Sequence, residues 1–96
     1  MNRDEIGVGK TYIGEKEDVR RILGIDQSFA PHAHTTDKQW VAYELITEPP
    51  KYKEKPKGVS KDGFPIYYCS LTAFRLWAKE EADFKLVYIQ HSEKLH

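Results

Sequence analysis

The sequence predicts one α+β domain, built on an antiparallel sheet of about four strands against which two short helices pack. Three observations support this fold class. A chain of 96 residues has room for one hydrophobic core. Short β-prone runs recur between clusters of glycine, proline and small polar residues. Aromatic residues form 12% of the chain and supply the large side chains that a small core needs. The pattern leaves open whether the sheet is barrel-like.

The first part of the chain predicts a strand followed by a helix. Residues 10–13 are β-prone and lie between glycines, which is typical of a short strand. In residues 15–23, Val19, Ile22 and Leu23 fall at helical spacing among charged side chains, and Gly24 follows at the position of a C-terminal cap. A strand over residues 19–25 is the alternative. The adjacent Ile22 and Leu23 count against it, because they break strict alternation.

The second part predicts two more strands and a helix between them. Residues 39–47 alternate most clearly, with Val41, Tyr43 and Leu45 on one face and Trp40, Ala42, Glu44 and Ile46 on the other. Residues 64–69 form a further β-prone run, and residues 84–90 alternate again. Between these runs, Ser70 or Thr72 is placed to cap a helix. That helix carries Leu71, Phe74, Trp77 and Ala78 at helical spacing.

Two segments predict loops. Residues 26–38 have no hydrophobic periodicity. Residues 51–62 are rich in lysine, and Pro56 and Gly58 argue against regular structure there. We therefore expect a solvated connection on each side of the central strand.

Composition limits the classes of function. The single cysteine excludes an internal disulfide, which favours the cytoplasm over a secreted location. The charged N-terminus has no apolar run behind it, so we expect neither a signal peptide nor a membrane partner. Fifteen basic and fifteen acidic residues balance, which argues against a general attraction to nucleic acid.

Several short motifs suggest catalysis without completing a site. Residues 7–11 are similar to the end of a P-loop, but the first glycine of that motif is replaced by Asp4, so we predict a turn before a strand. The acids Glu15, Glu17 and Asp18 are expected on the solvent face of the predicted helix. Cys69 lies among strand-forming residues and is expected to act as a small buried hydrophobe.

His32 and His34 are the candidate metal ligands. Alternating residues of an extended loop share a face, so the two imidazoles could bind one transition metal. A third ligand would come from Asp37, Cys69 or His91. His34 also begins a segment similar to one H-x-T element of the two-histidine phosphoesterases, whose second element the chain lacks. A metal-dependent or hydrolytic site here is a low-ranked alternative, and we expect no cofactor.

The lysine-rich loop is the candidate nucleic-acid site. Between Lys51 and Lys61, the residues Lys51, Lys53, Lys55 and Lys57 could follow a phosphate backbone while Tyr52 stacks on a base. The positive charge is local and small, so this binding would be weak and would depend on salt.

The segments 9–12, 40–45 and 70–77 together resemble small accessory proteins of phages and prophages that have compact, barrel-like sheets. This resemblance implies an accessory factor of a mobile element that acts by binding host proteins. It covers about a fifth of the chain and involves no catalytic signature.

Our leading hypothesis is therefore a non-enzymatic module that binds another protein. Tyrosine and tryptophan are enriched at binding hot spots, and the chain has more aromatic residues than a core of this size should hide. The predicted contact residues are Trp40, Ile46, Tyr52, Tyr67 and Trp77.

Overall fold

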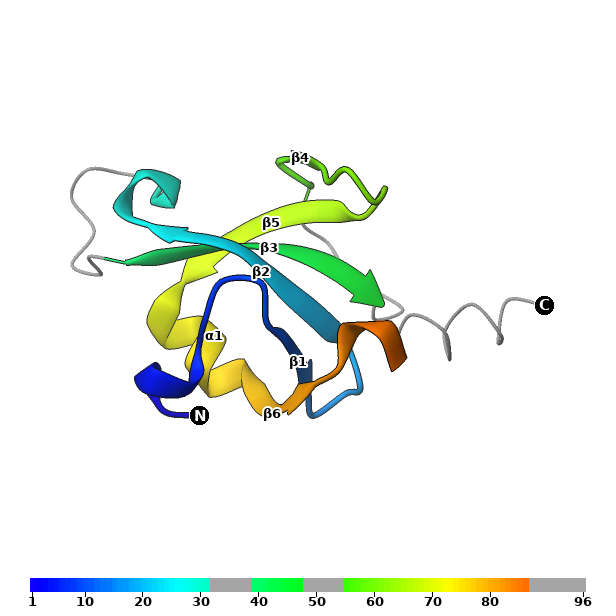
Figure 1. The fold of residues 1–96 in the computed structure, drawn as a ribbon. Helices are drawn as coiled ribbons and strands as arrows, with labels where there is room; N and C mark the ends of the chain where they lie inside the picture. The colour runs from blue at the N-terminus through cyan, green and yellow to red at the C-terminus, as the bar shows by residue number, and fades with distance from the viewer. Residues whose placement is uncertain (32–38, 48–54, 87–96) are drawn as a thin grey trace.

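β3 (Trp40–Thr47) lies inside an antiparallel sheet whose strand order is β4-β5-β3-β2-β1-β6 (Figure 1). The computed structural model describes residues 1–31, 39–47 and 55–86. Within them, the other strands are β1 (Thr11–Gly14), β2 (Val19–Asp26), β4 (Gly58–Val59), β5 (Pro65–Ser70) and β6 (Ala78–Ala82). The helical elements are α1 (Leu71–Trp77) and two 3-10 helices, η1 (Arg3–Glu5) and η2 (Gln27–Phe29).

The α+β class is confirmed, but the details of the sheet differ from the prediction. The described part of the chain forms six strands rather than about four, and the sheet is open rather than barrel-like. β2 and β3 pair over most of their lengths, and β1 and β5 flank them. The two edge strands, β4 and β6, were both missed.

β2 replaces the predicted helix, so the strand alternative was correct. Ile22 pairs with Tyr43 and Gly24 pairs with Ala42, which leaves Leu23 as an extra residue in a β-bulge. The bulge explains the misleading pattern. Ile22 is 1% exposed in the core, whereas the neighbouring Leu23 is 39% exposed. Two adjacent apolar residues thus coexist in a strand because one of them is not part of the regular pairing.

The turn before β1 confirms the prediction for the P-loop-like segment. Gly9 adopts φ +84°, a conformation that favours glycine, and its N–H donates to the carbonyl oxygen of Ile22 at 2.8 Å. Lys10 N–H donates to the carbonyl oxygen of Gly7 at 3.2 Å, which closes the turn. A strand follows rather than a helix, so no helix N-terminus is available to bind a phosphate.

The predicted strand at residues 64–69 and the helix after it are confirmed as β5 and α1. Ser70 is the N-cap, and its Oγ accepts a hydrogen bond from the backbone N–H of Ala73 at 3.1 Å. α1 buries Leu71 and Phe74, and the chain then turns directly into β6. The strand predicted over residues 84–90 is wrong at its start, since residues 84–86 are helical, and residues 87–90 lie outside the described part.

The core lies between one face of the sheet and α1. Tyr12, Tyr43 and Phe74 form its centre, and the Phe74 ring lies 5.5 Å from Tyr12 and 5.9 Å from Tyr43 between centroids. Each is at most 2% exposed. The Tyr12 hydroxyl donates to the carbonyl oxygen of Glu5 at 2.6 Å, so the buried phenol is satisfied. No helix in the described residues is long and apolar enough to cross a membrane.

Candidate functional site

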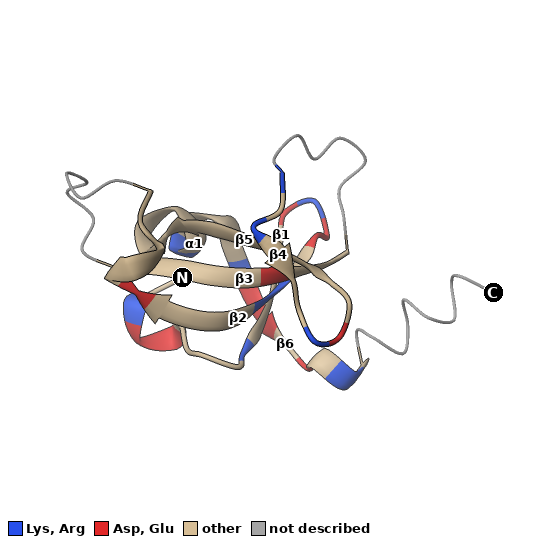
Figure 2. Cartoon of the chain, turned by 90° about the horizontal axis from the view of Figure 1, so that it is seen from above, with Lys and Arg blue, Asp and Glu red and all other residues tan. Residues whose placement is uncertain are grey.

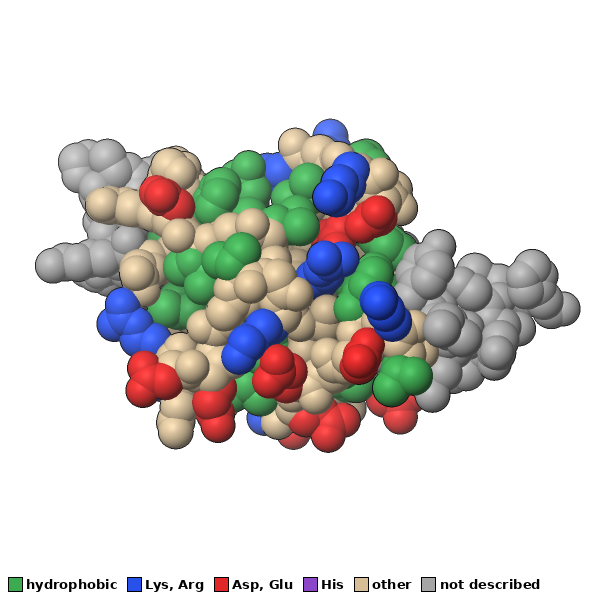
Figure 3. Space-filling view, in the orientation of Figure 1, with side chains coloured by type: hydrophobic (Ala, Val, Ile, Leu, Met, Phe, Trp, Pro, Cys, Tyr) green, Lys and Arg blue, Asp and Glu red, His purple; other side chains and the backbone are tan. Residues whose placement is uncertain are grey.

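A pocket of about 480 Å³ opens on the face of the sheet opposite the core. Three aromatic rings line it, from Phe29 in η2, Trp40 at the start of β3 and Tyr68 in β5. The other lining residues are Ser28, Ala30, Pro31, Lys55 and Lys57. Figure 3 shows hydrophobic side chains gathered on this side of the molecule between η2 and β4.

Strand register brings the three rings together. Trp40 pairs with Asp26 on one side and with Ser70 on the other, so the ends of β2, β3 and β5 meet there. Tyr68 lies two residues before Ser70 and pairs with Ala42, which places its side chain on the same face as Trp40. This face is opposite the one that carries Tyr43 and the core.

η2 holds Phe29 over this face. Asp26 caps η2, and its Oδ1 accepts from the backbone N–H of Ser28 at 2.8 Å. That N–H, aided by the Ser28 hydroxyl, lowers the pKa of the Asp26 carboxyl below its usual 3.8. The Phe29 ring contacts Tyr68 at 5.0 Å between centroids, with an angle of 44° between the planes. A Cβ at Gly24 would lie 3.2 Å from the Phe29 ring, so glycine allows the close packing.

Lysines make the pocket locally positive. Lys55 and Lys57 both line it and are exposed. Both the backbone and the side chain of Lys57 contact β5. The backbone N–H donates to the carbonyl oxygen of Ile66 at 2.7 Å, and Nζ lies 6.0 Å from the centroid of the Tyr68 ring. Several acidic residues lie away from the pocket, along η1 and β6 (Figures 2 and 3), whereas Asp26 lies beside it as the cap of η2. A chain of zero net charge therefore presents a cationic, aromatic pocket on one side.

The charged groups of the pocket are hydrogen-bond donors. The two lysine ammonium groups can only donate, whereas the Ser28 and Tyr68 hydroxyls can donate or accept. Trp40 Nε1 has no acceptor among the described residues, but it is buried and not open to the pocket. No described lining residue carries a carboxylate or an imidazole. The pocket is thus suited to an occupant that has apolar surfaces and negatively charged or acceptor groups, and its described lining residues include no acid–base pair.

Two of the predicted protein-binding residues are buried in the described part of the chain. Trp40 lines the pocket, but Ile46 and Tyr67 are each only 4% exposed. Tyr67 faces the core, where its ring lies 5.9 Å from that of Tyr43. Trp77 is half-buried at the end of α1, and Tyr52 lies outside the described residues. The cause is that β3 is covered on both faces, so its alternation does not separate buried from exposed side chains.

The lysine loop differs partly from the prediction of an irregular segment. Gly58 and Val59 form β4, which pairs with Ile66 and Pro65 of β5. This short pairing brings Lys55 and Lys57 beside the aromatic rings, whereas Lys61 follows in an exposed turn. Lys51 and Lys53 lie outside the described residues.

The metal hypothesis falls largely outside the described structure. His32, His34, Asp37 and His91 all lie in segments that are not described. Within residues 1–31, 39–47 and 55–86, no group of three potential metal ligands comes together. Cys69 is partly buried and packs against the core, in agreement with its predicted role as a small hydrophobe.

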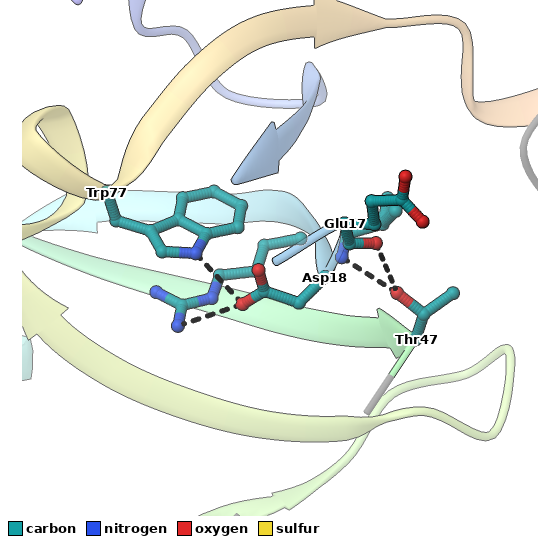
Figure 4. A network of polar contacts seen from close by, with 6 residues as sticks. Glu17, Asp18, Thr47 and Trp77 are labelled. Atoms are coloured by element: carbon teal, nitrogen blue, oxygen red, sulfur yellow. Dashed lines mark hydrogen bonds and ion pairs between the residues drawn. The ribbon is translucent and has the colours of Figure 1, made fainter. Parts of the chain in front are cut away.

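A buried polar network lies on the core side of the sheet (Figure 4). Asp18 was expected in solvent but is 7% exposed. Its Oδ2 accepts from Trp77 Nε1 at 2.9 Å and lies 3.5 Å from Arg20 Nη2. The Arg20 guanidinium packs between the rings of Trp77, at 4.1 Å, and Tyr43, at 4.6 Å. The network joins β2, β3 and α1, so we assign it to stability.

Phe29 and Tyr68 are the site residues that sequence reasoning missed. Phe29 lies in a segment without hydrophobic periodicity. Tyr68 belongs to a run of three strand-forming residues in which polar and apolar side chains do not alternate, so the pattern does not indicate which face is buried. The one available signal is Asp26 two residues before Ser28, a spacing that is typical of a capped turn.

Comparison of this chain with known protein families, with curated protein sequences and with solved structures finds no match.

Proposed function

We propose that this protein is a non-enzymatic interaction module that binds a segment of another protein in the pocket formed by Phe29, Trp40 and Tyr68. The observation that carries the proposal is the convergence of three aromatic rings, from η2, β3 and β5, on one opening. Tryptophan and tyrosine supply large contact areas at low entropic cost, which is why they dominate binding hot spots. The accessory role in a mobile element, expected from the sequence resemblance, remains part of this proposal.

The size and chemistry of the pocket support binding rather than catalysis. A volume of about 480 Å³ lies within the range of roughly 300–1,000 Å³ that is common for ligand sites. Lys55 and Lys57 supply positive charge at the opening, which favours a partner segment with acidic residues. Nucleic acid is the competing ligand, since lysines beside aromatic rings also suit a single strand. The zero net charge of the chain favours the protein partner.

Selection from a random peptide library displayed on phage tests this function. The wild-type chain should enrich a defined set of peptides, and Lys57→Glu should bind them at least about tenfold more weakly, because it reverses a charge beside the Tyr68 ring. Lys61→Glu is the matched control, since it makes the same change at an exposed lysine that does not line the pocket. Equal binding by both variants, or no enrichment at all, would refute the proposal.

A further inference from the structure

We propose that the occupant of this pocket is an extended, proline-containing segment that carries acidic residues. This inference rests on the proposed function and specifies the ligand that the same site takes. Proline-rich segments adopt a polyproline II conformation without internal hydrogen bonds, so every backbone carbonyl oxygen is a free acceptor. Such segments bind to grooves that are lined with aromatic side chains.

The aromatic rings of the pocket offer faces on which proline rings can pack. Phe29 and Tyr68 contact each other at 5.0 Å between centroids, with 44° between their planes, so an occupant packs on the faces that line the pocket and not between the two rings. Proline-rich segments pack on aromatic side chains in this way. Pro31 adds a further apolar wall.

The donor-rich lining matches the acceptor-rich ligand. Lys55 and Lys57 are the charged donors of the lining, and none of the described lining residues carries a carboxylate. A proline-containing segment presents only carbonyl acceptors at its proline positions, because proline has no N–H. The ammonium groups of Lys55 and Lys57 then favour glutamate or aspartate next to the prolines.

The two tryptophans allow a direct test by NMR titration of the ¹⁵N-labelled 96-residue chain. The probe is a peptide of Pro-Pro-Glu repeats, about 12 residues long, which is enough for several polyproline II turns. Its binding should shift the indole N–H signal of Trp40. The indole N–H of Trp77 is the internal control, because it donates to Asp18 on the core side and should not move.

Matched peptides separate the two parts of the proposal. Ala-Ala-Glu repeats keep the charge without the prolines, and Pro-Pro-Lys repeats keep the prolines with the opposite charge. Each should bind at least about tenfold more weakly, since each removes one of two independent contact types. Equal affinity for Ala-Ala-Glu would overturn the proline assignment, and equal affinity for Pro-Pro-Lys would overturn the acidic one.

Protein variants assign the binding to the pocket. Lys57→Gln should weaken the Pro-Pro-Glu peptide about fivefold, whereas Lys61→Gln should leave its affinity unchanged. A thymidine oligonucleotide that binds at the Trp40 signal, and that the peptide does not displace, would overturn the proposal in favour of nucleic acid. Library peptides that depend on Lys57 but lack proline and acidic residues would refute this inference and leave the proposed function standing.

Discussion

The buried carboxylate of Glu44 gives the sharpest prediction of stability. Its side chain is 1% exposed, and neither oxygen has a hydrogen-bond donor among the described residues. Its one ion pair within that part of the chain joins Oε1 to Arg21 Nη1 at 3.6 Å. Arg21 is itself held against the Phe84 ring at 4.4 Å and lies 3.8 Å from Asp62. Arg21 therefore supplies the compensating positive charge for the desolvated Glu44 carboxylate.

The magnitude follows from this geometry. Two unit charges 3.6 Å apart attract by about 5 kcal/mol at an effective dielectric constant of roughly 20. Breaking a buried pair by removing one partner usually costs about 3–5 kcal/mol. Since the Arg21 side chain is 30% exposed, we expect the lower end, so Arg21→Ala should lower the free energy of unfolding by about 3 kcal/mol.

A double-mutant cycle with Glu44→Gln isolates the pair. Glu44→Gln removes the charge, keeps the shape and loses no direct hydrogen bond to the described residues, so it should be close to neutral. In that background, Arg21→Ala should cost about 1 kcal/mol, the value left for the Phe84 contact and the exposed Asp62 pair. Urea denaturation of the four proteins measures the coupling. Equal losses in both backgrounds would show that Arg21 does not compensate Glu44.

Three further changes test other parts of the fold. Asp18→Ala should destabilise the protein by about 3 kcal/mol in urea denaturation, because it leaves the Arg20 guanidinium without its ion pair and the Trp77 indole without its acceptor. A loss below about 1 kcal/mol would contradict a stabilising role for these contacts. Gly14→Ala should cost about 2 kcal/mol or more in thermal denaturation, since its Cβ would overlap the Trp77 indole and lie 2.8 Å from Asp18 Oδ1. Gly58→Ala, with open space around the Cβ, should not destabilise the protein. Burial raises the pKa of the Tyr12 hydroxyl above 10.0, so the stabilisation from the neutral phenol is present below pH 10 and is lost as the pH rises through the raised pKa. Tyr12→Phe should remove this loss of stability at alkaline pH. An unchanged dependence of stability on pH in this variant would refute the prediction.

Local patterns in the sequence predicted the central elements. β1, β3, β5 and α1 were found because alternation, flanking turn residues and the Ser70 cap act over a few residues. β6 was missed because Ala, Lys and Glu have low β propensity. Its pairing with β1 holds it in the sheet, and that contact spans about 70 residues of sequence. Tertiary pairing, which no local window contains, overrides propensity there.

The pocket depends on register, which is why the sequence did not reveal it. Phe29, Trp40 and Tyr68 are far apart in the chain and belong to no shared periodicity. They meet because Asp26 pairs with Trp40 at the end of β2 and η2 begins at the next residue. The register of β2 against β3 shifts by one residue between Val19 and Arg20 and shifts back at the bulge at Leu23. Leu23, which breaks the alternation of β2 and so favoured the helix prediction, therefore also restores the register that places Phe29 near Trp40, and no local periodicity in the sequence shows that register.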